Sequence, residues 1–336
     1  MIWKNILIVL YFIVLLGSSI SLAQNQAPAP HMIPLPQLGA LNLNGSNLQV
    51  VATTSIIGDI VAQVGGDSIE LSTLIAAGQD PHSYEPAARD LTKVARAQVI
   101  FVNGWNLEES LLRNLQAVAS STPMVAVSAN IEPLELSPEE HAEDHDHGGE
   151  GDDHGSEGAD PHTWFSLNNV KQWVDNIRQS LSSLDPDRAS TYNANALAYL
   201  SKLDELDNYA REQIATIPPE KRILVTNHDV FAYFARDYGF EVLGTVIPAT
   251  STLAEPSAQD LATLIGTMRE HGLCTLFTEE TSSDKLAQTV AAELSNCTEV
   301  KVIPLYTGAL GAPGSGAETF VDMFKSNIDS MVEGLR

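Results

Sequence analysis

Apolar residues in the first half of the chain alternate between short β-rich runs and stretches with the spacing of a helix. The first helical stretch places apolar residues every three or four positions from Ile56 to Val64, and Gly65-Gly66 ends it. Further helices are expected from Pro86 and after Gly104. The runs that predict strands are Leu48–Thr54, Ile69–Ile75, Gln98–Asn103 and Met124–Val127. This half therefore predicts one α/β lobe with four strands.

The second half repeats this plan. Apolar residues recur at helical spacing between its strands and again from Phe320 to Leu335. The strands are expected at Arg222–Thr226, Glu241–Val246, Thr275–Thr278 and Lys301–Leu305. Alternating strands and helices indicate parallel sheets that are covered on both faces. The expected fold class is α/β, with two lobes that each hold a four-stranded, mainly parallel sheet flanked by helices.

One long helix is expected between the two halves, over residues 185–217. Asp185-Pro186 is a start signal, the residues from Tyr192 to Leu206 keep a helical period, and Pro218-Pro219 ends it. At 1.5 Å per residue this helix would be about 45 Å long, enough to join both lobes as a rigid strut. Two shorter helices with a break are the alternative. The lobes then comprise residues 48–184 and 218–336.

Residues 1–23 are typical of a signal peptide. Lys4 gives a positive charge, Ile6–Leu16 is almost wholly apolar, and Ser21-Leu22-Ala23 offers small residues for cleavage. A membrane anchor is the alternative, but the apolar run is short for a spanning helix of about 20 residues. No cysteine near the cleavage point can accept a lipid, so we expect a soluble periplasmic protein. Residues 24–47 contain four prolines and predict a tether, with order beginning near Leu48.

The charge of the chain and its two cysteines restrict the classes of function that it can have. The net charge is −25, from 18 basic and 43 acidic residues, which argues against binding to nucleic acid and favours an attraction for cations. The two cysteines, Cys274 and Cys297, are expected to pair in an oxidising compartment. A thiolate metal site is the alternative, but it would normally need closer spacing and more ligands.

Residues 139–160 form a segment of unusual composition. It has ten acidic residues, four histidines and neither lysine nor arginine, so it predicts a disordered loop. The histidines are His141, His145, His147 and His154. The loop is either a weak collector of zinc ions or only a solvated spacer.

Three other histidines follow predicted strands of both lobes. His82 and His162 each stand in an Asp-Pro-His sequence in the first lobe, and His228 directly follows a strand of the second. Loops at the carboxyl ends of parallel strands converge, so these side chains can meet in a cleft between the lobes. A single histidine is more often a surface or core residue, but three at such positions predict a metal site. Imidazole nitrogen suits Zn²⁺, which prefers four ligands in a tetrahedron.

A fourth ligand is expected from the loop after the strand Thr275–Thr278, by the same geometry. Asp284 is the first candidate, and Glu280 and Glu279 are the alternatives. Asp284 also stands near a helix start, where a carboxylate is an ordinary first-turn residue.

Longer motifs surround these residues. They are GQDPHSYEP at 78–86, NGWNLE at 103–108, DPHTW at 160–164, HDVFAYF at 228–234 followed by Tyr238-Gly239, EPS at 255–257 and FTE at 277–279. With them the chain resembles, from about Leu48 to Leu335, the metal-binding branch (cluster A-I) of the solute-binding proteins that serve ABC transporters. The resemblance implies two α/β lobes joined by a rigid helix, one transition-metal ion in the cleft, and His82, His162 and His228 as its ligands.

The resemblance is to zinc-type members in particular. Manganese-type members carry a carboxylate at the position that matches His228, and oxygen ligands suit Mn²⁺ whereas imidazole suits Zn²⁺. The His-rich acidic loop and the pair Cys274 and Cys297 also resemble features of zinc-type members. The resemblance implies a protein that captures Zn²⁺ in the periplasm and delivers it to an ABC permease. We expect a monomer. A periplasmic metallochaperone is a candidate further partner, and the sequence does not show whether one loads the site.

Two rival functions use the same residues. A zinc hydrolase would need three protein ligands and an open position for water, but the sequence has no HExxH signature and no nucleophile elbow. We therefore expect no enzyme activity. A zinc buffer, a metallochaperone or an adhesion protein could hold the ion without a transporter, and no sequence feature separates these from transport.

Overall fold

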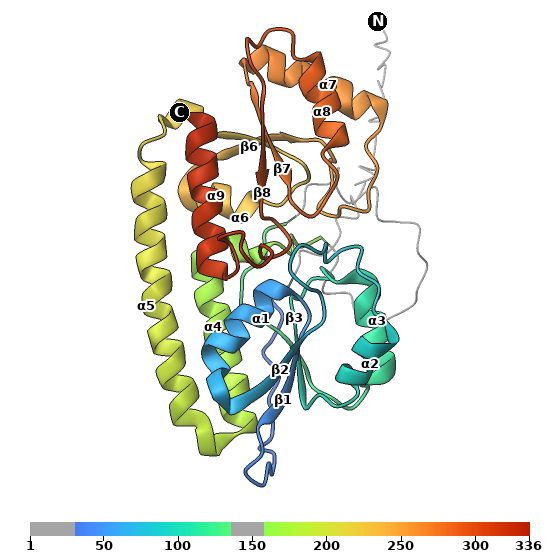
Figure 1. Ribbon diagram of the computed structural model, residues 1–336, viewed down its shortest axis with the longest axis vertical. Helices are drawn as coiled ribbons and strands as arrows, with labels where there is room; N and C mark the ends of the chain where they lie inside the picture. The colour runs from blue at the N-terminus through green and yellow to red at the C-terminus, as the bar shows by residue number, and fades with distance from the viewer. Residues whose placement is uncertain (1–30, 136–157) are drawn as a thin grey trace, which may run out of the picture.

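Two four-stranded sheets organise the chain, whose computed structural model describes residues 31–135 and 158–336. The N-terminal sheet has the order β2-β1-β3-β4 and the C-terminal sheet the order β6-β5-β7-β8, and every strand pair is parallel. The strands are β1 (Leu48–Ala52), β2 (Ile69–Thr73), β3 (Val99–Val102), β4 (Met124–Ala126), β5 (Ile223–Thr226), β6 (Glu241–Thr245), β7 (Thr275–Glu279) and β8 (Lys301–Leu305). Figure 1 shows one sheet above the other, and the predicted fold class is confirmed.

Helices cover both faces of the N-terminal sheet. They are α1 (Ser55–Gly65), α2 (Ala88–Val94), α3 (Glu109–Val118) and α4 (Leu167–Leu184). Alternate residues of a strand point to opposite faces, so Val50 packs in the core formed with α1 and α4. Its neighbour Val51 packs with Val94 of α2 and Leu111 of α3. Burial of both faces explains why the strands appear as continuous apolar runs in the sequence.

The C-terminal sheet is covered in the same way. Its helices are α6 (Ala232–Tyr238), α7 (Ala258–His271), α8 (Lys285–Glu293) and α9 (Phe320–Leu335). Leu276 of β7 packs with Leu264 of α7 and Val290 of α8. The next residue, Phe277, points to the other face and belongs to the same core as Phe324 of α9.

The helix α5 (Ala189–Ile214) joins the lobes, and the predicted long central helix is confirmed. Its 26 residues span about 39 Å, somewhat less than expected, because a 3-10 turn at Pro186–Arg188 separates it from α4. In Figure 1 it runs beside α4 in one lobe and α9 in the other. Its buried residues recur at helical spacing: Tyr192, Ala196, Tyr199, Leu203, Leu206, Ala210 and Ile214. One continuous apolar core therefore extends through α5 from β1 to α9.

The segment before β1 is placed differently from the expectation. Residues 31–47 form no helix or strand, yet they lie against the N-terminal lobe, so the prediction that order begins near Leu48 is wrong. Leu41 donates a backbone hydrogen bond to the Leu184 carbonyl at 2.8 Å, and the Ile33 carbonyl accepts one from Asn130 at 2.8 Å. The prolines suggested a tether, but the apolar residues between them pack on the core: Ile33, Leu35, Leu38 and Leu43.

Several sequence features can be located on this framework. Cys274 and Cys297 form the expected disulfide, which links the start of β7 to the segment between α8 and β8. The signal peptide and the loop histidines His141, His145, His147 and His154 lie outside the described residues.

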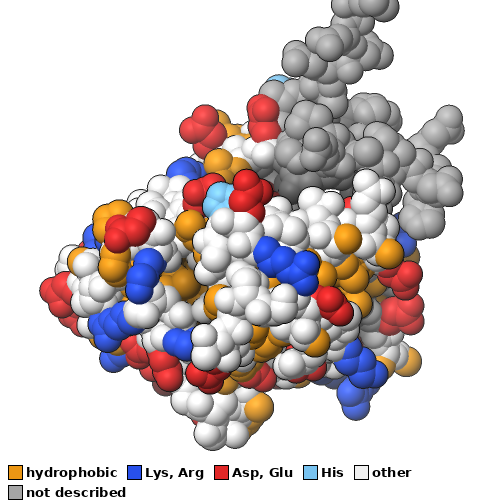
Figure 2. Space-filling model, turned by 90° about the horizontal axis from the view of Figure 1, so that it is seen from above, with side chains coloured by type: hydrophobic (Ala, Val, Ile, Leu, Met, Phe, Trp, Pro, Cys, Tyr) orange, Lys and Arg blue, Asp and Glu red, His pale blue; other side chains and the backbone are white. Residues whose placement is uncertain are grey.

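No helix in residues 31–135 and 158–336 combines the length and apolarity needed to span a bilayer. On the face shown in Figure 2, acidic and basic side chains are intermixed.

Loss of the disulfide should destabilise the C-terminal lobe. We expect Cys274→Ser with Cys297→Ser to lower the free energy of unfolding by about 3 kcal/mol, because the bridge closes a loop over a separation of 23 residues. Urea unfolding followed by circular dichroism measures this. The wild type unfolded in dithiothreitol is the matched control and should lose a similar amount. An unchanged midpoint in both would contradict the expectation.

Candidate metal centre

Three buried histidines from both lobes meet at one point. His82 lies in the loop after β2, His162 in the connection between β4 and α4, and His228 in the loop after β5. Their exposed fractions are 4%, 1% and 2%. The Nε2 atom of His162 lies 3.3 Å from the Nε2 atoms of both His82 and His228. Among the described residues these three form the one group of potential metal ligands that the structure brings together.

The repeated Asp-Pro-His sequence has a local explanation. The Oδ1 atom of Asp80 accepts a hydrogen bond from the backbone N–H of His82 at 3.0 Å, and Asp160 Oδ1 accepts one from His162 at 2.9 Å. An aspartate that binds the N–H two residues on forms a tight turn, and the proline between them fixes its backbone angle. Each turn thereby sets the direction of the histidine that follows.

Each imidazole also has a carboxylate near its outer nitrogen. Asp160 Oδ1 lies 2.8 Å from the Nδ1 of His162, Glu279 binds the Nδ1 of His228, and Glu109 Oε1 lies 3.6 Å from the Nδ1 of His82. A carboxylate at Nδ1 holds the proton on that nitrogen and leaves the lone pair on Nε2. The Nε2 lone pairs of His162 and His228 therefore face the small volume that they share with Nε2 of His82, where a cation would stabilise them.

The spacing of the nitrogens suits a tetrahedral ion. Ligand nitrogens about 2.0–2.1 Å from a zinc ion lie about 3.3–3.4 Å from one another in a tetrahedron. The two Nε2 separations of 3.3 Å match that edge length. The donor set and its geometry therefore fit a divalent transition metal.

The electrostatics keep the site ready for a cation. Burial, with the neighbouring His228 and His82, holds the pKa of His162 well below its usual value, so this ring stays neutral. Burial also raises the pKa of Asp160 to about 7. At His228 burial acts to lower the pKa, but Glu279 outweighs it and the pKa is raised. Burial acts to raise the pKa of Glu279, but contact with His228 lowers it to about 2.

The predicted fourth ligands do not join the three nitrogens. Asp284 is exposed at the start of α8 and accepts a hydrogen bond from Gln288, and Glu280 is also exposed. Glu279 is buried but binds the outer nitrogen of His228. A fourth protein ligand from this loop therefore stays a prediction.

The motif at residues 103–108 supports the turn that carries His162. Asn103 donates from Nδ2 to the Pro161 carbonyl at 2.8 Å, which holds the turn before His162. The fully buried Glu108 accepts from the Asn103 backbone at 2.7 Å and from the Thr53 hydroxyl, and burial raises its pKa. The sequence marked the motif without indicating this role. The three carboxylates at Nδ1 were likewise not foreseen as a set, although Asp160 is adjacent to His162 in a repeated motif.

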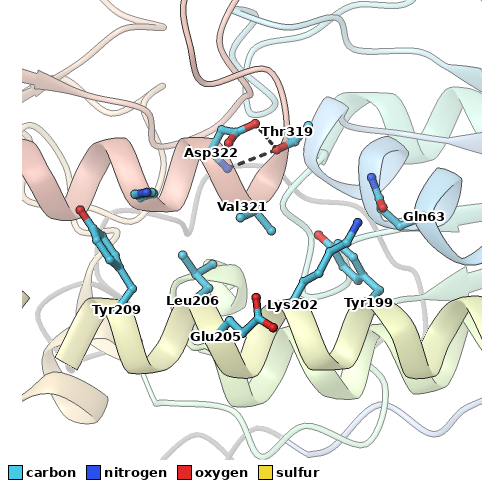
Figure 3. Close-up of a pocket in the computed structure, with 10 residues that line it drawn as sticks. Gln63, Tyr199, Lys202, Glu205, Leu206, Tyr209, Thr319, Val321 and Asp322 are labelled. Carbon is cyan, nitrogen blue, oxygen red and sulfur yellow. Dashed lines mark hydrogen bonds between the residues drawn. The ribbon is translucent and has the colours of Figure 1, made fainter. Parts of the chain in front are cut away.

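The molecule also has a pocket far from this chemistry. A cavity of about 420 Å³ lies between α1, α5 and α9, where Tyr199, Leu206 and Tyr209 of α5 lie opposite Val321 of α9 (Figure 3). Its lining contains neither histidine nor cysteine, so it lacks the ligands that a transition metal prefers. The metal centre is instead a closed cluster between loops.

Comparisons with known proteins agree with this fold. The profile of the family described as ZnuA, zinc-uptake complex component A, periplasmic, matches residues 50–334. The manganese-binding lipoprotein MntA of Halalkalibacterium halodurans is 36% identical over 293 residues, which cover 87% of this chain and 90% of the relative. The manganese ABC transporter substrate-binding lipoprotein PsaA of Streptococcus pneumoniae is 32% identical over 303 residues, with coverage of 87% and 90%.

Solved structures give the same result. The periplasmic zinc-binding protein TroA of Treponema pallidum superposes with a TM-score of 0.76 and 30% identity, covering 86% of this chain and 99% of that one. The manganese-bound periplasmic metal-binding protein of Candidatus Liberibacter asiaticus has a TM-score of 0.72 and 31% identity, with coverage of 85% and 99%.

These relatives contradict the location expected from the sequence. We expected a soluble periplasmic protein without lipid attachment, whereas MntA and PsaA are named lipoproteins. The expectation rested on cysteine positions, since the two cysteines of the chain are those of the disulfide. A leader pattern indicates export but does not determine how the exported chain is held, and the expected location is withdrawn.

The carboxylate at His162 should control metal affinity. We expect Asp160→Asn, which keeps the side-chain volume, to weaken binding of a divalent metal by about 10–100-fold, because Nδ1 of His162 loses its charged partner. Isothermal titration calorimetry measures the change. Asp175→Asn, which alters an ion pair with Arg178 on the surface of α4, is the matched control. Equal affinities for the two variants would contradict the role of Asp160.

Proposed function

We propose that Zn²⁺ is the cargo of this chain, which belongs to the ZnuA family of metal-binding components of ABC transporters. The chain is therefore a substrate-binding protein whose partner is the membrane permease of such a transporter. The single observation that carries the choice of zinc is the set of three imidazole Nε2 atoms, two pairs of which are 3.3 Å apart. Neutral imidazole nitrogen suits Zn²⁺ better than it suits Mn²⁺.

Manganese is the second candidate, because several relatives are named for it. MntA and PsaA carry manganese in their names, whereas TroA is named for zinc. A manganese site favours carboxylate and water oxygens. In this chain the carboxylates of Asp160, Glu279 and Glu109 lie at the outer nitrogens of the rings, and that arrangement supports zinc. Asp80 binds the backbone of His82 instead of its ring.

The cycle of capture and release follows from the same contacts. The negative charge of the chain draws cations toward it. The three imidazoles then replace part of the water shell of the ion, with His82 and His162 from one lobe and His228 from the other. Hydrogen bonds across the lobes retain the closed form, such as that from Trp164 Nε1 to the Thr307 carbonyl at 2.9 Å. Docking to the permease would release the ion by separating these loops.

Movement during this cycle should be small. The apolar core passes without interruption through α5, so wide separation of the lobes would expose much buried surface. Rearrangement of the loops that carry the histidines requires no such exposure. Weak zinc binding by His141, His145, His147 and His154, loading by a metallochaperone and a monomeric state remain predictions.

Zinc should outcompete manganese at this site. We expect one zinc ion per chain to bind at least about a hundredfold more tightly than manganese, because the donors are nitrogens. Competition calorimetry with both ions measures the ratio. Replacing His82, His162 and His228 by alanine should abolish tight binding, while His271→Ala, at an exposed position, should not. A preference for manganese, or tight zinc binding by the triple variant, would overturn the proposal.

Zinc affinity should depend on pH through His228. Its raised pKa means that a proton competes with the metal at a higher pH than at an ordinary histidine, so the fall in affinity on acidification begins at a higher pH. The loss should reach up to about tenfold per pH unit for each competing proton. Glu279→Gln removes the main cause of the raised pKa and should move the fall to lower pH. Titrations between about pH 8 and pH 5 test this, and an unmoved profile in Glu279→Gln would contradict it.

A further inference from the structure

His82 is the least secured of the three histidines within its own lobe. The partners of His162 and His228, Asp160 and Glu279, are almost completely buried. The carboxylate near Nδ1 of His82 belongs instead to Glu109, whose side chain is 29% exposed and lies 3.6 Å away. A partly exposed carboxylate at this distance orients an imidazole weakly unless another group fixes it.

That other group comes from the opposite lobe. Ser251 Oγ donates a hydrogen bond to Glu109 Oε1 at 2.7 Å, the same oxygen that lies near His82. Thr252 Oγ1 donates to Asp80 Oδ2 at 2.6 Å, while the other oxygen of Asp80 accepts from the His82 backbone. Two adjacent hydroxyls of the C-terminal lobe thus hold both carboxylates that position His82.

The loop that carries these hydroxyls is tied to His228. It follows β6, and its backbone binds the loop after β5 on both sides of that histidine. Ile247 donates to the Asn227 carbonyl at 2.7 Å, and Asp229 donates to the Ala249 carbonyl at 3.0 Å. A continuous path of hydrogen bonds therefore connects the histidine loop of one lobe to the carboxylates around His82 in the other.

We propose that Ser251 and Thr252 are positioning residues that hold His82 toward the ion, so that breaking their two bonds to Glu109 and Asp80 frees the ion. The inference rests on the proposed zinc site. The two bonds join residues of the two lobes, so we expect them to act on retention of the ion. Capture, which begins from a more open arrangement, does not need them.

The test is the rate of zinc release from the full chain loaded with one ion. Ser251→Ala with Thr252→Ala should release zinc to a chromogenic chelator at least about tenfold faster, since each lost bond was made to a charged group. The rate of zinc uptake should stay within about twofold. Thr250→Ala is the control, because its hydroxyl makes no hydrogen bond within the described residues.

Two further variants separate positioning from a general loss of structure. Ser251→Thr with Thr252→Ser keeps both hydroxyls and should restore slow release. In a Glu109→Ala background, Ser251→Ala should change the release rate by less than about twofold, because the shared contact is already gone. Stopped-flow measurements of zinc release from the wild type, Ser251→Ala, Glu109→Ala and the variant with both changes complete this double-mutant cycle.

Failure of the positioning role can be told apart from failure of the proposed zinc site. If the wild type takes up no zinc, the proposed function fails. If the wild type binds zinc and the double alanine variant releases it at the wild-type rate, the positioning role is overturned. Faster release that persists unchanged in the Glu109→Ala background would also overturn it, because the effect would not pass through that carboxylate.

Discussion

The contact between an imidazole and a carboxylate is the interaction on which this site depends. At His162 and His228 a carboxylate bound to the outer nitrogen leaves the inner nitrogen with a free lone pair, and at His82 Glu109 lies 3.6 Å from the outer nitrogen. Lone pairs at such close range repel one another, and the surrounding carboxylates add negative charge to a buried place. A dication between the rings removes both penalties together. The protein thus keeps an arrangement that is costly by itself and becomes favourable when the cargo arrives.

The fold supplies the rigidity that this arrangement needs. Parallel strands deliver all three histidines from loops at their carboxyl ends, where the two lobes face each other. Behind those loops, Asn103 fixes the turn before His162 and the buried Glu108 fixes Asn103. The continuous core along α5 limits how far the lobes move apart. The hydrogen bonds and the packing behind the loops therefore fix the positions of the ligands.

Much of this architecture could be predicted because it is written in local patterns. Continuous apolar runs indicated the strands of both sheets, and apolar residues at helical spacing indicated the long helix. The positions of His82, His162 and His228 after predicted strands indicated where these side chains would meet. Interactions between distant elements could not be predicted in this way. Nothing near Glu109 in the sequence reveals that α3 brings it to His82. Asp284 was expected from its loop, but the first turn of α8 leaves it beside Gln288.

Composition was also a poor guide for the segment before β1. Its prolines suggested a tether, while the spacing of Ile33, Leu35 and Leu38 between them allows an irregular backbone to bury apolar side chains. The location of the protein was misjudged for a related reason. A leader pattern and the cysteine positions do not determine how an exported chain is held, and relatives named as lipoproteins contradict the expectation.

Both lobes pack against helix α5, and this limits how the chain can be cut into separate lobes. Its buried face serves the N-terminal lobe at Tyr192 and Ala196, and the same stripe continues to Ile214 beside the C-terminal lobe. A fragment that ends before α5 would leave the apolar sides of α1 and α4 facing water, and the complementary fragment, which keeps α5, would expose the part of α5 that packs against them. Neither half is therefore a transferable module. Any chimera that exchanges lobes between relatives must include α5 together with the surfaces that cover it on both sides.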